Sequence, residues 1–189
     1  WRAKEISADD IERFASSLEE LNISHPLSHS SYLINLAAPA SELWKKSIDA
    51  MVVELLRAGM LGIPYVVMHP GSFTSSSEAK GLKRIAKAID TIHRQTNDAN
   101  ILLENTAGQG TNLGWRFEHL AAIIDAVTDP DRLGVCFDTC HAFAAGYAMG
   151  TEKEYKATMR ELNKTVGVKL IKAFHLNDSK REFGSRVDR

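Results

Sequence analysis

The chain has 189 residues, of which 44% are hydrophobic and 25% charged, as is typical of a globular domain with a buried core. No run of about 18 uncharged apolar residues occurs, and no basic segment precedes an apolar one, so we expect neither a transmembrane helix nor a signal peptide. A net charge of −1 argues against a general DNA-coating protein, but it allows a nuclease that carries bound cations.

Five amphipathic helices are indicated by apolar residues that recur three and four positions apart. Residues suited to N-capping stand at their starts, such as Ser7 and Ser41. Gly59, Gly62 and Pro64 mark the end of the second helix. In chain order, the predicted helices span about 7–21, 41–59, 77–95, 115–127 and 152–166.

A short apolar strand follows each predicted helix. The strands are a weak one near 22–27 and stronger ones at 65–68, 101–103, 133–137 and 170–174. Helices that alternate with continuously apolar strands are typical of parallel strands covered on both faces. A doubly wound sheet and a closed barrel both satisfy this pattern, so the polar residues must decide between them.

A residue able to bind metal follows each strand, at intervals of 34 to 40 positions that correspond to one strand–helix unit. In chain order these residues are His29, His69, Glu104, Asp138 and His175. In a closed barrel the carboxyl ends of the strands form one ring, so these side chains would converge. In an open sheet they would lie along a line. The pattern therefore favours an α/β fold of the TIM (β/α)8 barrel type.

A complete barrel of this type needs about 250 residues, and 189 residues hold five to six strand–helix units. We therefore expect residues 1–189 to be a single, incomplete barrel domain, with units missing before Trp1 and after Arg189. Two unpaired strand edges would be exposed in such a fragment. We expect the isolated chain to be unstable and inactive, and the full-length protein to be active.

His141, three residues after Asp138, and Asp188 are further candidate ligands. A lone histidine after a strand is usually an ordinary loop residue, but here the pattern recurs at five successive strand ends. Mixed histidine and carboxylate ligands suit Zn²⁺, and less well Mn²⁺ or Fe²⁺. Seven candidates exceed the needs of one ion and predict a cluster of at least two that shares a carboxylate. Such clusters hydrolyse phosphoesters.

The other histidines and the cysteines carry no assigned role. His25 precedes a proline, and His93 and His119 lie on predicted helices. Cys136 and Cys140 are too few for a disulfide framework or a separate metal site, so we interpret them as structural thiols in a reducing cytosol. No nucleophile elbow or P-loop occurs, and the short glycine turn at 108–110 does not make a dinucleotide site.

Six long motifs extend across the chain: residues 29–35 (HSSYLIN), 69–72 (HPGS), 104–110 (ENTAGQG), 136–146 (CFDTCHAFAAG), 175–180 (HLNDSK) and 183–189 (FGSRVDR). In order and spacing they resemble the endonuclease IV family, and its bacterial branch most closely. The resemblance implies a TIM barrel that cleaves the DNA phosphodiester on the 5′ side of abasic sites in base excision repair. It also implies trimming of blocked 3′ ends.

The resemblance implies three zinc ions, with Mn²⁺ as a possible substitute. Glu104 would bridge the first two ions and stand beside the attacking hydroxide as the catalytic carboxylate. Two further ligands of the family pattern, a histidine and a glutamate, would fall beyond Arg189. The remaining ligands implied are His29 and His69 for the first ion, Asp138 and His175 for the second, and His141 and Asp188 for the third.

The partner implied is double-stranded DNA with abasic sites, bound by a monomer in the bacterial cytoplasm, at the nucleoid and not at a membrane. Tyr32 and Leu33 match a loop that wedges into the duplex while the damaged nucleotide turns into the pocket. From the residues alone, core packing of Tyr32 and Leu33 would be favoured over this role. Lys180, Arg186 and Arg189 would contact phosphates, or would form an ordinary solvated face.

Two alternatives remain open at this point. A sugar isomerase or epimerase of the same barrel type also carries metal ligands at strand ends, but it needs fewer histidines than His29, His69 and His141 supply. The second alternative is a non-catalytic fragment that binds damaged DNA or folds poorly. Activity on a free ketose would favour the first alternative.

Overall fold

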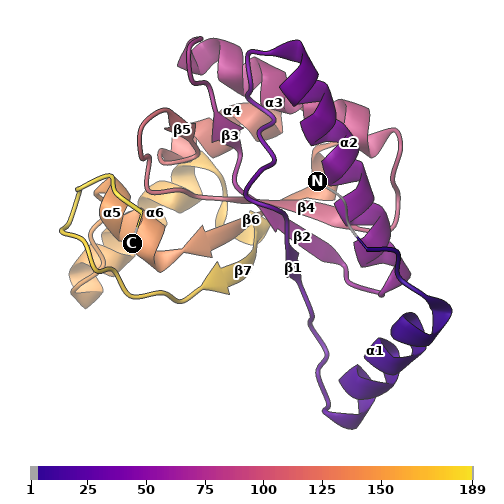
Figure 1. The fold of residues 1–189 in the computed structure, drawn as a ribbon. Helices are drawn as coiled ribbons and strands as arrows, with labels where there is room; N and C mark the ends of the chain where they lie inside the picture. Colours follow the sequence, from indigo (N-terminus) through magenta and orange to yellow (C-terminus); the bar gives the residue numbers. More distant parts are fainter. Residues whose placement is uncertain (1–3, 189) are drawn as a thin grey trace.

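In the computed structural model, which describes residues 4–188, five parallel strands form one curved sheet (Figure 1). Their order across the sheet is their order along the chain, without reversal. A doubly wound sheet reverses its strand order at a switch point, so this arrangement is a partial TIM barrel. The strands are β1 (Ser28–His29), β2 (Tyr65–Met68), β4 (Asn100–Glu104), β6 (Leu133–Asp138) and β7 (Ile171–His175).

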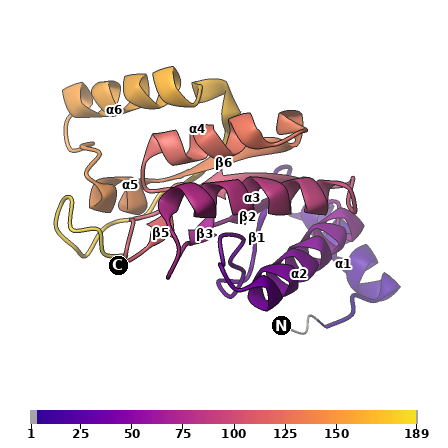
Figure 2. The same ribbon diagram turned by 90° about the horizontal axis from the view of Figure 1, so that it is seen from above.

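The crossover helices all lie on one face of the sheet, where they form a row along it (Figure 2). This placement is that of the outer helix layer of a barrel. The predicted helices agree with the observed ones to within a few residues at each end. They are α2 (Ser41–Met60), α3 (Glu78–His93), α4 (Phe117–Ala126) and α6 (Glu152–Thr165).

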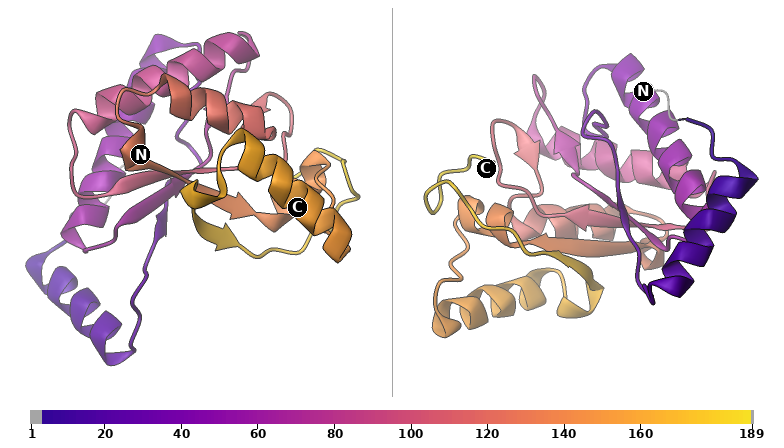
Figure 3. Two further views of the ribbon diagram at one scale, coloured as in Figure 1. Left: turned by 180° about the vertical axis from the view of Figure 1, so that it is seen from behind. Right: turned by 60° about the horizontal axis from the view of Figure 1, so that its bottom comes forward.

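The first helix, α1 (Ala8–Glu20), begins with the expected cap. The Ser7 hydroxyl accepts from the Asp10 backbone N–H, and the Asp10 carboxylate accepts from the Ser7 backbone N–H. None of the residues of α1 is fully buried, and the helix stands away from the sheet (Figures 1 and 3). The weak strand predicted at 22–27 is wrong: the paired strand is β1, which starts at Ser28, and Pro26 has no N–H to give to a ladder.

Short elements that the periodicity did not indicate complete the structure. Segments β3 (Gly71–Ser72) and β5 (Asn112–Leu113) pair antiparallel above the carboxyl end of the sheet. Helix α5 (Thr139–Ala145) follows β6 directly, and two 3₁₀ turns, Pro130–Arg132 and Val168–Leu170, precede β6 and β7. These elements lie around the strand ends or lead into the strands.

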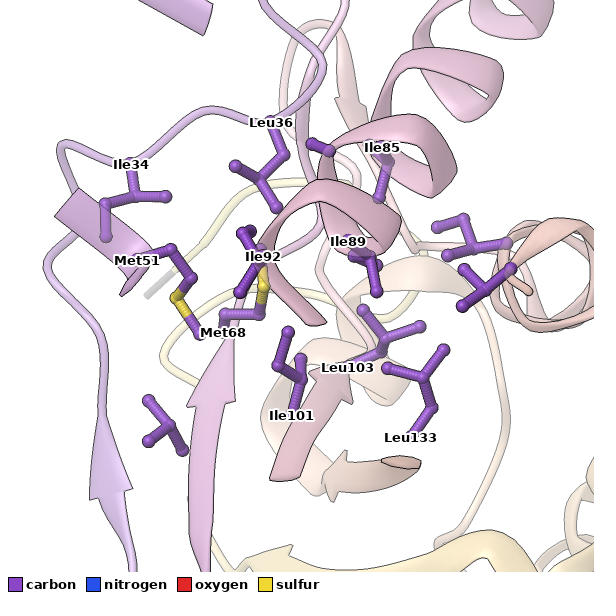
Figure 4. Packing of buried hydrophobic residues seen from close by; sticks show 14 of the residues in the cluster. Ile34, Leu36, Met51, Met68, Ile85, Ile89, Ile92, Ile101, Leu103 and Leu133 are labelled. Atoms are coloured by element: carbon purple, nitrogen blue, oxygen red, sulfur yellow. The ribbon is translucent and has the colours of Figure 1, made fainter. Parts of the chain in front are cut away.

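The main core lies between the sheet and the helices (Figure 4). Alternate strand residues point into it, and each large side chain fully buried there contributes about 1.5–3 kcal/mol to folding. Fully buried side chains of this core include Met51, Met68, Ile85, Ile89, Ile101 and Leu103. The other strand residues face the barrel interior, where Val67, Leu102 and Cys136 form a small cluster of their own.

His93, in the last turn of α3, is buried, and neither ring nitrogen has a hydrogen-bond partner among residues 4–188. Burial and the Arg132 guanidinium lower its pKa to about 4, against weaker opposing effects of Asp129 and Asp90. The unfolded chain binds a proton near pH 6.5, where folded His93 stays neutral. The contribution of neutral His93 to the free energy of unfolding is therefore fully present above pH 6.5 and is lost as the pH falls toward 4.

We expect His93→Leu to weaken the acid sensitivity of the protein. Between pH 7 and pH 4.5 the wild type should lose about 2–3 kcal/mol more unfolding free energy than the variant, since one pKa unit corresponds to about 1.4 kcal/mol. Urea unfolding of both proteins at the two pH values measures this difference. Parallel losses in the two proteins would contradict the assignment.

Candidate metal centre

The candidate ligands extend the inward-facing rows of the strands. Val67, Leu102, Cys136 and Ala173 face the barrel interior, and each stands two positions before a candidate ligand. Because side chains alternate along a strand, the residue two positions later points the same way. The residues placed at one end of the barrel interior by this rule are His69, Glu104, Asp138 and His175.

The centre of the cluster is the Glu104 carboxylate, which is 1% exposed. Its Oε2 lies 2.9 Å from His29 Nε2 and 3.4 Å from His69 Nε2. Its Oε1 lies 3.0 Å from His175 Nδ1 and 3.2 Å from His141 Nδ1. One buried carboxylate thus contacts four imidazoles, which come from four different segments of the chain.

Asp138 and Asp188 lie on either side of His141. Asp138 is the N-cap of α5, and its Oδ1 accepts from the His141 backbone N–H at 2.7 Å. Its Oδ2 accepts from Asn177 Nδ2 at 2.6 Å and lies 3.8 Å from His175 Nδ1. The Asp188 Oδ1 lies 3.3 Å from His141 Nε2. All seven residues singled out from the sequence therefore lie in one connected cluster.

The hydrogen bonds of two histidines leave a place for a proton or a metal ion between each ring and a carboxylate. His29 Nδ1 donates to the Ser30 carbonyl at 2.8 Å, and His141 Nδ1 donates to the Asn105 carbonyl at 2.9 Å. Each ring then turns its Nε2 toward a carboxylate, Glu104 or Asp188. Two lone-pair atoms repel at such distances unless a proton or a metal ion lies between them.

The distances are also of the order expected for metal ligation. Two donor atoms bound to one tetrahedral zinc ion lie about 3.4 Å apart, and the distances from the Glu104 carboxylate to His29 Nε2, His69 Nε2 and His175 Nδ1 run from 2.9 to 3.4 Å. There are two sets of three donor atoms, and within each set all the atoms lie within 4.8 Å of one another. Glu104 belongs to both sets. One set adds His29 and His69, and the other adds Asp138 and His141.

The charges of the cluster depend on one another. Burial raises the pKa of Glu104, but hydrogen bonds from His141, His29 and His69 outweigh it and hold that pKa well below its usual range. Burial lowers the pKa of His141, whereas Glu104 and Asp138 raise it, to about 9. The hydrogen bond to Glu104 likewise raises the pKa of His29. The site therefore attracts positive charge, and metal binding must displace protons from it.

Asn105 holds this cluster together and was not singled out from the sequence. Its amide donates to the Asp138 carbonyl at 3.0 Å and accepts from the Asp138 backbone N–H at 2.8 Å. It thus pairs with Asp138 as a strand residue would, while its own carbonyl fixes the His141 ring. The feature of the sequence that could have indicated Asn105 is its position, directly after Glu104 at the end of a buried strand.

Of the residues expected to contact DNA, Tyr32 lines a pocket beside the cluster. Tyr32 is 91% exposed and Leu33 38%, so neither is a core residue. Tyr32, His69 and Asp188 line one pocket of about 300 Å³. Lys180 and Arg186 are exposed on the segment that leads to Asp188, and Arg189 lies outside the described residues. Their contacts with DNA stay predictions.

The histidines and cysteines without an assigned role lie outside the cluster of candidate ligands or are buried beside it. His25 is exposed and contacts Ser24. His119 is buried, and its Nδ1 accepts from the Gly114 N–H at 3.1 Å. Both cysteines are buried and unpaired, and neither belongs to the two metal-ligand sets found within the described part of the chain.

No helix among residues 4–188 is long and apolar enough to cross a membrane. The whole chain, residues 1–189, matches the family model described as xylose isomerase-like TIM barrel. It is 50% identical to the probable endonuclease 4 of Chloroflexus aggregans and 47% identical to that of Geobacter sp. strain M21. These alignments cover all of this chain and 67% and 68% of the two relatives.

Solved structures show the same relationship. The crystal structure of endonuclease IV from Thermus thermophilus superposes with a TM-score of 0.84 at 36% identity, over 100% of this chain and 66% of that one. A D-tagatose 3-epimerase-like protein gives 0.72 at 22% identity, over 92% of this chain and 63% of that one, a likeness of fold alone. The chain thus spans about two thirds of the length of its relatives.

Proposed function

Because this chain belongs to the endonuclease IV family, we propose that the protein hydrolyses the DNA phosphodiester bond on the 5′ side of abasic sites and trims blocked 3′ ends. The observation that carries the proposal is the cluster of histidines and aspartates around the buried Glu104 carboxylate. Such a ligand set holds several divalent cations close together. Phosphoester hydrolysis is the chemistry that such sites support best.

Three zinc ions are proposed for this centre, with Mn²⁺ as a substitute. Glu104 belongs to both sets of closely spaced donors, which supports its role as a bridging ligand. Zinc bound here would supply Lewis-acid activation of water and of the phosphodiester. The proposed ligands are His29 and His69 for the first ion, Asp138 and His175 for the second, and His141 and Asp188 for the third, with Glu104 shared by the first two.

The residues of this chain would orient the substrate and the ligands. Tyr32, exposed at the rim, would wedge into the duplex beside Leu33. A nucleotide turned out of the stack at that point would enter the pocket that Tyr32 shares with His69 and Asp188. Asn105 would keep Asp138 and His141 in place throughout. The partner proposed is double-stranded DNA in the bacterial nucleoid, bound by a monomer in which residues 1–189 belong to a single, incomplete barrel domain.

The test combines metal analysis with a cleavage assay on the protein at the full length of its natural gene. We expect about three zinc ions per chain, cleavage of a duplex that carries one abasic site, and loss of cleavage when a chelator removes the metal. An undamaged duplex of the same sequence is the control. One ion per chain, no cleavage, and conversion of a free ketose would overturn the proposal and support a sugar isomerase.

A further inference from the structure

Asp188 lies well beyond the end of β7 at His175, so no strand end positions it. It lies in residues 176–188, a segment without regular helix or strand that passes beside α5 (Figure 3). Toward its end, the backbone of this segment is hydrogen-bonded to α5: the Gly184 N–H donates to the Phe143 carbonyl, and the Arg186 N–H donates to the Ala144 carbonyl. Something further must hold the Asp188 carboxylate next to His141.

The backbone at Arg186 is in an unfavourable conformation. Its φ of +52° lies in the left-handed region, where glycine is tolerated and a residue with a side chain meets a steric penalty. Such a conformation persists only when surrounding contacts enforce it. Contacts of Arg186 must therefore enforce this backbone conformation.

The Arg186 guanidinium is stacked on an aromatic ring. Its Cζ lies 3.9 Å from the centre of the Trp115 ring, within the range of a cation–π interaction. Its Nη2 also donates to the Gly108 carbonyl at 2.9 Å. A Cβ at position 108 would lie 2.6 Å from Trp115 Cγ and 3.0 Å from Arg186 Nε, so only glycine leaves room for this stack.

The stack joins the segment to the loop that directly follows Glu104. The next residue of that loop, Gln109, accepts the Asp188 backbone N–H through its Oε1 at 3.1 Å. Arg186 and Asp188, the residues on either side of Val187, are thus both hydrogen-bonded to the same loop. The contacts of the Arg186 guanidinium with Trp115 and Gly108 form the anchor of the segment on this loop.

We infer that Arg186, stacked on Trp115, is a positioning residue that keeps Asp188 beside His141 as a ligand of the third metal site. The inference rests on the proposed zinc centre. It gives Arg186 a different role from the phosphate contact that the resemblance implies. The stacking and hydrogen-bond partners of its guanidinium are Trp115 and Gly108, neither of which is a candidate ligand, so Arg186 acts through the segment.

The test is Arg186→Gly in the zinc-loaded, full-length protein. Glycine suits the left-handed backbone, so the fold should be kept while the anchor is lost. We expect zinc content to fall from about three ions to two per chain. The affinity for the third ion should fall by about 10- to 100-fold, as for other supporting residues of metal sites. Trp115→Leu should show the same selective loss, and added zinc should restore cleavage in both variants.

Lys180→Ala is the matched control, because it removes one positive charge from the same segment. It should keep three zinc ions whatever its effect on DNA affinity. If Arg186→Gly also keeps three ions at unchanged affinity and only weakens DNA binding, Arg186 is a phosphate contact and the inference is wrong. A wild-type protein that binds no zinc would overturn the proposed function itself, and this inference with it.

Discussion

Glu104→Gln is expected to lower cleavage of an abasic-site duplex by at least about 10³-fold. Glutamine keeps the size and shape of the side chain but removes the negative charge that four imidazoles share at 2.9–3.4 Å. The substitution thereby removes the one carboxylate that belongs to both donor sets. Zinc content measured on the same preparation should fall by one or two ions per chain.

A spectroscopic consequence separates this effect from misfolding. Burial lowers the pKa of His141, and the carboxylate of Glu104 is the largest of the opposing influences that raise it to about 9. In metal-free Glu104→Gln protein this pKa should fall, and NMR titration of the imidazole can follow it. Glu118→Gln, on the exposed face of α4, is the matched control and should change neither zinc content nor cleavage. Full zinc content and full activity in Glu104→Gln would refute the central role of Glu104.

Asn105→Ala is expected to destabilise the protein by about 3–5 kcal/mol. The side chain is 1% exposed and makes two hydrogen bonds to the backbone of Asp138. Its removal leaves a buried N–H and a buried carbonyl unpaired, at about 1–3 kcal/mol each, and adds a small cavity. The free energy of unfolding should be measured with chelator present, so that zinc binding does not contribute.

The control for Asn105→Ala is Asn163→Ala. Asn163 is exposed near the end of α6, and its Oδ1 accepts one hydrogen bond, from the Val168 N–H at 2.9 Å. Its loss should cost about 1 kcal/mol or less. Equal losses in the two variants would show that the paired backbone of Asp138 has no special role in holding the site.

The sequence predicted five of the helices, four of the strands and the cluster because these depend on regular spacing. Apolar residues at helical intervals indicated α2, α3, α4 and α6, and continuous apolar runs indicated β2, β4, β6 and β7. The candidate ligands at the strand ends converge because parallel strands that curve into a barrel bring their carboxyl ends together. The seven residues found in one cluster are those expected from this rule and from the family resemblance.

What the spacing did not indicate depends on contacts between distant segments. The pairing of β3 with β5 involves two residues on each side, which are too few to give a period. Helix α5 has seven residues and begins at Thr139, directly after the candidate ligand Asp138, so its start looked like part of the motif. The roles of Asn105 and Arg186 follow from partners at positions 138 and 115, which no local pattern connects to them.

The contacts within the cluster join residues that are far apart along the chain. Glu104 meets His29 across 75 positions and His175 across 71, while His141 meets Asp188 across 47. Closing loops of this length is slow compared with forming a helix or a turn, and these contacts arise only when the strands have assembled in order. Zinc uptake during refolding should therefore be a late event that reports the arrival of the last strands, and not an early step that guides the first ones.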